Sequence, residues 1–201
     1  MMKYKVLAFI GEAGAGKDTL ARELLAADPI THKVISCTTR GPREGEKDGE
    51  DYYFLSESQF RADITYGYFA EFTSFNGWFY GTRFSELNKY KINIGVFNPE
   101  GIRNLMKRKD IDLRVVRVKA DRSLRKERYL ARDPECDKEE LERRMAADDK
   151  DFSCLNFDYV TLNNNSKEDL ELNIKKLGRW LQMWRNTEGQ KWLKKNKQNY
   201  I

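Results

Sequence analysis

A glycine-rich segment that ends in lysine has the most recognisable chemistry in this chain. It follows the apolar run at residues 6–10 and reads Gly-Glu-Ala-Gly-Ala-Gly-Lys over residues 11–17. Glycine permits unusual backbone angles and a close approach of backbone N–H groups to an anion, while the lysine adds a mobile positive charge. A strand, this loop and then a helix form the context in which the pattern binds a nucleoside triphosphate. The sequence therefore predicts an ATP site made by Gly11, Glu12, Ala13, Gly14, Ala15, Gly16, Lys17, Asp18 and Thr19.

The residue after the lysine departs from the common form of this loop. Asp18 stands where many such loops have Ser or Thr, whose hydroxyl binds Mg²⁺ directly. Either Asp18 holds magnesium through water or Thr19 takes over part of this role, and the sequence leaves both open. We therefore expect ATP and Mg²⁺ as cofactors.

Composition excludes several other kinds of chemistry. His32 is the only histidine among 201 residues, which rules out histidine-based triads and multi-histidine zinc sites. No apolar run approaches the roughly 18 residues that span a membrane, and the first residues carry no secretory signal pattern. The three cysteines, Cys37, Cys136 and Cys154, are odd in number and widely spaced, which favours free thiols. These features predict a cytoplasmic protein without membrane contact.

Strand and helix patterns alternate along most of the chain. Strands are expected at 4–10, 33–38, 92–97, 114–119 and 159–162, and helices at 17–27, 100–108, 123–132, 138–149 and 167–183. This alternation predicts an α/β, three-layer P-loop fold with a central parallel sheet. Residues 39–84 break it with Gly, Tyr and Phe and with short β-like pieces at 52–55 and 78–80. We expect a single domain with its core at about 1–38, 85–132 and 145–185, an inserted mixed-β lobe at about 39–84, a helical lid at about 133–144 and a basic tail at 186–201.

The inserted lobe carries four motifs in a fixed order. They are Ser-Cys-Thr-Thr-Arg-Gly-Pro-Arg-Glu-Gly-Glu at 36–46, Gly-Glu-Asp-Tyr-Tyr-Phe at 49–54, Glu71 after a short apolar step, and Tyr-Gly-Thr at 80–82. In these motifs the chain resembles guanylate kinases, which have the same blocks at compatible spacing. The resemblance runs from the first strand to about Asn164. It implies phosphorylation of GMP or dGMP by ATP, with the nucleoside monophosphate bound in the inserted lobe.

The resemblance also implies roles for individual residues. Arg40 and Arg43 are three apart, and their guanidinium groups can clamp a monophosphate. Tyr52 and Tyr80 can donate to the same phosphate or stack beside the base. Glu71 can accept hydrogen bonds from guanine N1–H and the 2-amino group, a donor pair that adenine lacks.

Three further positions complete the expected acceptor site. Ser36 and Thr82 can donate to guanine O6, and Gly81 belongs to the same motif as Thr82. Asn98 stands where the family has the second aspartate of an Asp-x-Asp-x-Gln-Gly segment. It can still accept through its carbonyl, but it lacks the charge, and Glu100 is a candidate to compensate.

Arginines gather on the two predicted helices around residue 135. In nucleoside monophosphate kinases such a helix–turn–helix is the lid, whose arginines approach the β- and γ-phosphates. By register with the family, Arg128, Arg132 and Arg144 are expected to act with Lys17 as the catalytic residues, by neutralising charge during transfer. A solvated face in which these arginines pair with nearby glutamates is the alternative.

Two other functions fit parts of the pattern. A kinase of another phosphorylated acceptor, such as a different deoxynucleoside monophosphate or a ribose bisphosphate, does not need Glu71 and Ser36 as a guanine-reading pair. A non-catalytic phosphopeptide-binding module of guanylate kinase type typically lacks an intact phosphate loop, whereas Lys17 and its glycines are present. We expect nucleotides as the partners of a monomer or homodimer, and the basic tail is too weak a signal to predict nucleic-acid binding.

Overall fold

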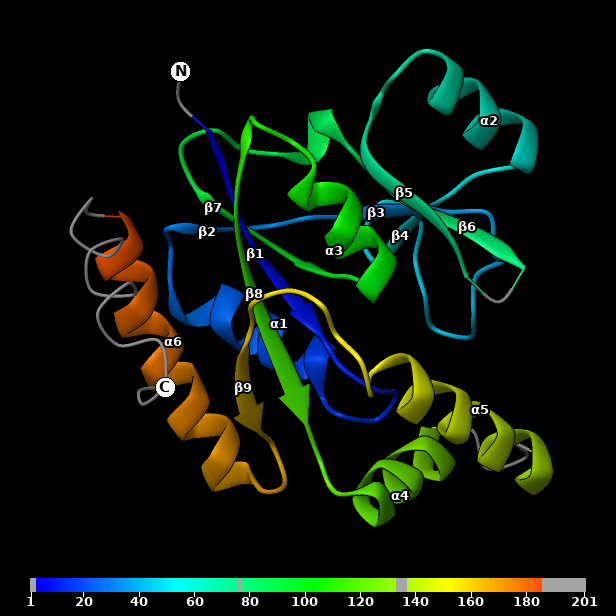
Figure 1. Cartoon of the computed structure of the whole chain (residues 1–201), viewed down its shortest axis with the longest axis vertical. Coiled ribbons are helices and arrows are strands. Elements are labelled where there is room, and N and C mark those ends of the chain that lie inside the picture. The colour runs from blue at the N-terminus through cyan, green and yellow to red at the C-terminus, as the bar shows by residue number, and fades with distance from the viewer. Residues whose placement is uncertain (1–2, 76, 133–136, 186–201) are drawn as a thin grey trace. The chain divides into compact units, whose positions relative to one another are not determined.

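The computed structural model describes residues 3–75, 77–132 and 137–185 (Figure 1). The chain forms two compact units. Unit 1 contains Met1–Ala8 and Ile30–Arg114, and unit 2 contains Phe9–Pro29 and Val115–Ile201. The strands β1 (Tyr4–Ile10) and β8 (Ile111–Lys119) each belong partly to both units.

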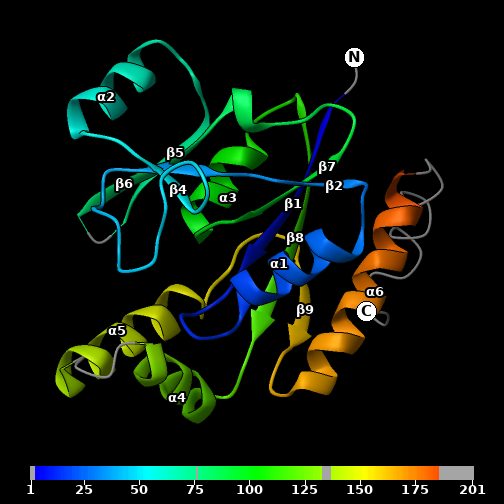
Figure 2. The same cartoon turned by 180° about the vertical axis from the view of Figure 1, so that it is seen from behind.

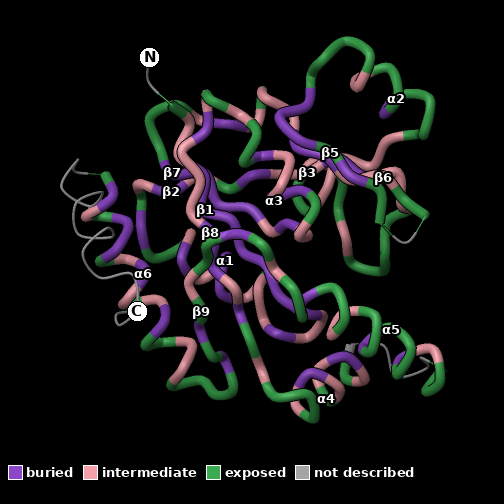
Figure 3. The backbone as a smooth tube through the Cα atoms, in the orientation of Figure 1, coloured by how far each residue is buried: buried purple, intermediate pink, exposed green. Residues whose placement is uncertain are grey.

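The central sheet has five strands in the order β2-β7-β1-β8-β9. Its other members are β2 (Thr31–Lys33), β7 (Ile92–Val96) and β9 (Val160–Asn163). β2 pairs with β7, and β8 with β9, in parallel. Residues 6–10 of β1 are completely buried, as expected for a strand covered on both faces (Figure 3). The expected α/β fold with a central parallel sheet is confirmed.

The expected strand at 33–38 is wrong, because the chain changes sheets within it. β2 ends at Lys33, and the N–H of Val34 donates the last bond to β7. β3 (Ser36–Thr38) then enters a second, four-stranded sheet. Both halves are partly apolar, so the pattern of the sequence contains no break between them.

The second sheet lies in unit 1 and has the order β4-β3-β6-β5. It contains β4 (Tyr52–Phe54), β5 (Phe69–Phe75) and β6 (Trp78–Arg83). β3 pairs with β4 in parallel, whereas β3 with β6 and β5 with β6 are antiparallel. The sheet is therefore mixed, as expected, and its pairing brings together the sequence motifs from residues 36–38, 52–54, 71 and 80–82.

The helix α2 (Glu57–Thr65) in unit 1 was not expected from the sequence. Ser56 caps it by accepting from the Gln59 N–H, and the Gln59 side chain accepts in turn from the Ser56 N–H. Phe60 anchors the helix in a buried cluster with Cys37 and Phe69. The Ser-x-x-Gln spacing was a signal in the sequence that could have located this helix.

Unit 1 also contains the short 3₁₀ helix η1 (Phe84–Glu86) and α3 (Pro99–Met106), which packs against β5. The other helices are α1 (Lys17–Ala27), α4 (Arg122–Arg132), α5 (Lys138–Asp151) and α6 (Lys167–Arg185) in unit 2.

The helix α6 has a buried apolar stripe at helical spacing, formed by Leu177, Trp180, Leu181 and Trp184. It packs against α1, as the rear view shows (Figure 2). Within the described residues, no helix has both the length and the apolar character needed to cross a membrane.

Candidate functional site

The phosphate loop lies in unit 2, between the end of β1 and the start of α1. Gly14 and Gly16 have φ values of 77° and 88°, in the left-handed region. A Cβ on Gly14 would lie 2.6 Å from the Arg125 carbonyl oxygen, and one on Gly11 would lie 2.2 Å from the Val118 carbonyl oxygen. These glycines are thus required by both backbone angle and space. The helix α1 begins at Lys17, so its N-terminus, the positive end of the helix dipole, lies at the end of the loop.

Lys17 and Glu12 are linked across the loop. The Lys17 Nζ donates to the Glu12 carbonyl oxygen at 3.1 Å. The Glu12 carboxylate is buried and forms an ion pair with Arg117 of β8, at 2.6 Å between Oε1 and Nη2. The guanidinium carbon of Arg117 lies 5.5 Å from the centre of the Phe152 ring and 6.0 Å from that of Tyr159. Nothing in the sequence indicated Arg117.

A carboxylate from α5 also contacts the loop. The Ala13 N–H donates to Asp148 Oδ2 at 2.6 Å. Burial raises the pKa of Asp148, partly opposed by the Ala13 N–H and by the positive charges of Lys17 and Arg125. Asp148 was not among the expected site residues. It places an anion on a backbone N–H of the glycine-rich loop.

Arg128 also contacts the backbone of the loop. It donates to the Gly14 carbonyl at 3.2 Å and to the Asn164 carbonyl at 3.0 Å. The buried Asn164 donates through Nδ2 to the Ala15 carbonyl at 3.1 Å. The structure therefore places Arg128 beside the phosphate loop, together with Asn164, which the sequence reasoning did not identify.

The other expected lid arginines differ from Arg128. Arg144 donates to Glu140 Oε1 and to the Tyr129 hydroxyl, both at 2.6 Å, and Arg143 also pairs with Glu140. These two arginines hold the pKa of Glu140 at about 2. The described contacts of Arg144 are thus those of the salt-bridged alternative. The side chain of Arg132 lies outside the described residues, although its backbone ends α4.

The two candidate metal-facing residues lie in the first turn of α1. Asp18 is exposed and Thr19 is half-buried. No group of three or more His, Cys, Asp or Glu side chains suited to a metal occurs in the described ranges. A magnesium ion here would need phosphate oxygens and water as most of its ligands, which is how Mg²⁺ commonly binds with nucleotides.

The residues expected to contact the guanine base lie together in the second sheet of unit 1. Glu71 on β5 pairs in register with Thr82 on β6, and Glu71 is only 6% exposed. Burial raises the pKa of Glu71 to about 7, although hydrogen bonds from the Thr82 hydroxyl and backbone N–H lower it. The Ser36 and Thr82 hydroxyl oxygens are 3.5 Å apart. Glu71, Thr82 and Ser36 therefore form one polar group within the second sheet.

Asn98 adjoins this group as the N-cap of α3. Its Oδ1 accepts from the Gly101 N–H at 2.7 Å, and its Nδ2 donates to Thr73 Oγ1 at 2.8 Å. A Cβ on Gly101 would lie 3.0 Å from Glu71 Oε2 and 3.3 Å from Asn98 Oδ1. Asn98 thus fixes the start of α3 close to Glu71, and both ends of its amide are engaged.

The expected phosphate-binding residues gather around Glu46. The two terminal nitrogens of Arg40 each lie 2.9 Å from an oxygen of the Glu46 carboxylate, and the Arg43 N–H donates to the same carboxylate at 2.8 Å. Arg40 also hydrogen-bonds Tyr80 and lies 5.5 Å from the centre of the Tyr52 ring. Glu46 belongs to the motif at residues 36–46 but was not among the expected site residues. In the structure its carboxylate pairs with the two terminal nitrogens of Arg40.

Gly81 has a packing explanation. A Cβ at this position would lie 3.0 Å from ring carbons of Phe60 and Phe69. The residue is buried next to Thr82 in β6. The absence of a side chain at Gly81 lets the Phe60 and Phe69 rings pack directly against β6, the strand that carries Thr82 and Tyr80.

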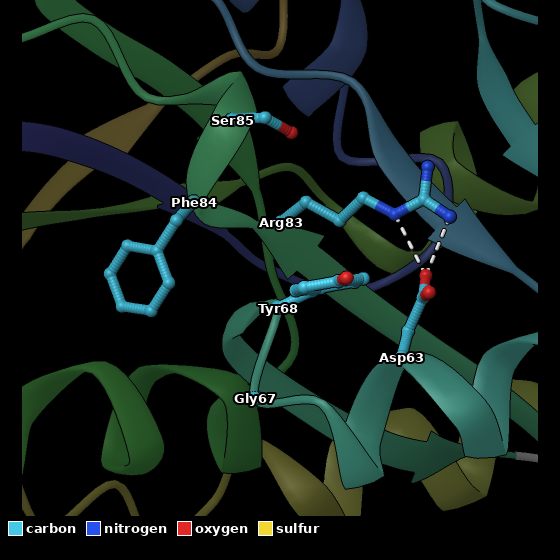
Figure 4. Close-up of a pocket in the computed structure, with 6 residues that line it drawn as sticks. All are labelled: Asp63, Gly67, Tyr68, Arg83, Phe84 and Ser85. Atoms are coloured by element: carbon cyan, nitrogen blue, oxygen red, sulfur yellow. Dashed lines mark hydrogen bonds and ion pairs between the residues drawn. The ribbon is translucent and has the colours of Figure 1, made fainter.

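A separate surface hollow in unit 1 has a volume of about 440 Å³ (Figure 4). It is lined by Asp63, Gly67, Tyr68, Arg83, Phe84 and Ser85. Its polar feature is the ion pair between Arg83 and Asp63, at 2.5 Å. None of the expected site residues lines this hollow.

Comparisons with known proteins agree with these features. The sequence model of the guanylate kinase family matches residues 3–183. A guanylate kinase of Helicobacter pylori is 34% identical to this chain over 174 residues, which cover 84% of each chain. A guanylate kinase of Prochlorococcus marinus is 32% identical over 177 residues, which cover 85% of this chain and 95% of the other. The crystal structure of guanylate kinase from Anaplasma phagocytophilum superposes with a TM-score of 0.66 at 21% identity, over 92% of this chain and 88% of that one, and shows the shared fold.

Proposed function

Because the chain belongs to the guanylate kinase family, we propose that it transfers the γ-phosphoryl group of ATP to GMP or dGMP. An oxygen of the acceptor phosphate forms the new bond to phosphorus, the bond between the γ-phosphorus and its bridging oxygen breaks, and ADP leaves. The observation that carries this proposal is the buried carboxylate of Glu71 beside the hydroxyls of Thr82 and Ser36.

Glu71 reads guanine through two adjacent donors. Guanine presents N1–H and the 2-amino group side by side, and a carboxylate accepts from both. The Ser36 hydroxyl then donates to the neighbouring O6, and so does the Thr82 hydroxyl once its single proton turns from Glu71 to the base. Adenine has a lone pair at N1 and no 2-amino group, so it would supply neither of these donors to the buried carboxylate. The loss of both is expected to cost several kilocalories per mole, at about 1–3 kcal/mol per lost partner.

The acceptor phosphate binds to Arg40, Arg43, Tyr52 and Tyr80. Arg40 already presents its fork to a planar carboxylate, that of Glu46, and phosphate oxygens match the same geometry. On binding, the phosphate shares or replaces this carboxylate. Residues at about 39–84 thus serve as the acceptor lobe.

The phosphate loop and Lys17 bind the donor. Backbone N–H groups of residues 11–19 surround the ATP phosphates, while Lys17 and Arg128 neutralise charge that shifts between the γ-phosphate and ADP. Arg132, directly before the lid at about 133–144, and Arg144 at its end act in the same way, for which Arg144 must exchange Glu140 for phosphate. No general base is needed, because the acceptor oxygen is already anionic near neutral pH.

Mg²⁺ would be held by ATP phosphate oxygens, by Asp18 through water and by Thr19. When bound, it supplies positive charge that neutralises the β- and γ-phosphates. The exposed Asp18 carboxylate in the first turn of α1 fits such a water-mediated contact. The free thiols of Cys37 and Cys154 support a reducing, cytoplasmic location.

Turnover with a panel of acceptors tests the proposal. ADP release from ATP and Mg²⁺ is measured with GMP, dGMP, AMP, CMP and UMP presented separately. Turnover confined to GMP and dGMP is expected, and the ratio between these two gives the sugar preference. No turnover with either, from a protein that binds ATP in calorimetry, would contradict the proposed reaction.

A further inference from the structure

Glu12 is engaged at both its backbone and its side chain. Its carbonyl oxygen accepts from Lys17 Nζ at 3.1 Å, and its carboxylate pairs with Arg117 at 2.6 Å. The side chains of Glu12 and Arg117 are only 8% and 12% exposed. A buried carboxylate in a loop that binds polyphosphate repels its ligand unless a cation neutralises it. Arg117 is the cation that does so.

Each partner of this ion pair depends on the other. Glu12 Oε2 and Arg117 Nε are buried and have no hydrogen-bond partner in the part of the chain that the structure describes. Among the contacts that the structure describes, the 2.6 Å ion pair with Arg117 offsets most of the free-energy cost of burying the Glu12 carboxylate. Removing Arg117 alone would therefore leave an uncompensated negative charge at the second residue of the loop.

Strand β8 supports the loop at two consecutive residues. The Val118 carbonyl lies so close to Gly11 that a Cβ there would be 2.2 Å from it, and the side chain of Arg117 reaches Glu12. Arg117 also contacts two aromatic rings, since its guanidinium carbon lies 5.5 Å from the centre of the Phe152 ring and 6.0 Å from that of Tyr159, and it hydrogen-bonds Tyr159. The guanidinium is thus held in one place before any ligand binds.

We propose that Arg117 is a positioning residue for the ATP phosphates, acting through Glu12. It neutralises the Glu12 carboxylate and keeps that residue's carbonyl where it holds Lys17. This inference rests on the proposed function, because it assumes that the loop binds ATP. Without Arg117, the freed carboxylate repels the phosphates and attracts the Lys17 ammonium away from its place.

Binding of ATP and Mg²⁺ by calorimetry, without acceptor, tests the proposal separately from turnover. Arg117→Met keeps the length of the side chain and removes its charge, and its ATP affinity is expected to fall at least about tenfold, the size of one uncompensated charge near a polyphosphate. Arg117→Lys keeps a positive charge beside Glu12, and because the proposal depends on this charge, its ATP affinity is expected to stay within about threefold of the wild type. The KM for GMP is expected to change less than about twofold in both variants, since its site is formed by other residues.

The double variant Glu12→Gln with Arg117→Met distinguishes charge compensation from simple packing. Removal of the carboxylate is expected to restore most of the ATP affinity lost in Arg117→Met. If Arg117 only packs against the two rings, the double variant binds ATP no better than the single one, and the proposal is wrong. Thermal unfolding shows whether Arg117→Met folds. If it does not, the double variant and Arg117→Lys still test the proposal, because weak ATP binding in both would overturn it.

A wild-type protein that binds ATP but does not phosphorylate GMP would refute the proposed reaction and leave the role of Arg117 testable. A wild-type protein that binds no ATP would refute both.

Discussion

The pH dependence of GMP binding follows from the burial of Glu71. The pKa of this carboxyl is raised to about 7 in the ligand-free protein, chiefly by burial. Guanine N1–H and its 2-amino group are donors, so they bind the ionised carboxylate and not the protonated acid. With a pKa of about 7, about 3% of Glu71 is ionised at pH 5.5 and about 90% at pH 8. Ionisation of Glu71 is therefore expected to contribute a rise of about 30-fold in GMP affinity between these two pH values, and this contribution levels off above pH 7.5.

Calorimetry of GMP binding without ATP, at half-unit steps from pH 5.5 to 8, measures this dependence. Buffers with different ionisation enthalpies report the proton that Glu71 releases on binding near pH 6. The phosphate of GMP also ionises near pH 6 and contributes its own pH dependence. Glu71→Gln is the matched control, because it keeps the phosphate contribution and removes that of Glu71. Equal pH dependence in the wild type and in Glu71→Gln would refute the assignment of this carboxylate to guanine.

The raised pKa of Glu71 also makes the stability of the folded protein depend on pH. The folded pKa of Glu71 lies above its ordinary value of 4.5, so the folded protein binds the proton more tightly than the unfolded chain. Its contribution is fully present below pH 4.5 and is lost as the pH rises through 7, by about 3 kcal/mol in total. Glu71→Gln is expected to lose this part of the pH dependence in urea unfolding.

Three further predictions concern other parts of the two units. Asp148→Asn removes a carboxylate from the Ala13 N–H, so ATP is expected to bind several-fold more tightly at pH 7.5 in calorimetry; weaker binding would show that Asp148 supports the loop instead. Gly81→Ala brings a methyl group within 3.0 Å of two phenylalanine rings and is expected to destabilise the protein by about 1–3 kcal/mol in urea unfolding, and an unchanged midpoint would refute its packing role. Asn98→Ala removes the cap of α3 and is expected to cost about 1 kcal/mol, while Asn98→Asp keeps the acceptor for the Gly101 N–H and is expected to recover most of that loss.

The phosphate loop was the part of the molecule best predicted from the sequence. The strand before it, its glycines and the helix that begins at Lys17 all follow from local constraints on backbone angles and periodicity. The strand expected at 33–38 failed for the opposite reason. Its division between two sheets depends on pairing with β7 and with β6, which local pattern does not contain.

The contacts that organise the loop could not be predicted in the same way. Glu12 and Arg117 are 105 residues apart, and Ala13 and Asp148 are 135 apart. Each of these charged residues, seen in sequence alone, is equally well explained by a solvated surface. The helix α2 was different, because Ser56 and Gln59 were visible at the spacing of a capping box.

The most direct test of the central claim compares kcat/KM for GMP and AMP in the wild type and in Glu71→Gln. The wild type is expected to prefer GMP by about 10⁴-fold, because its buried acceptor pairs with guanine donors that adenine lacks. Glu71→Gln is expected to reduce that ratio at least tenfold while leaving ATP binding unchanged. Similar rates for GMP and AMP in the wild type, or an undiminished ratio in the variant, would contradict the role of Glu71 in recognising guanine.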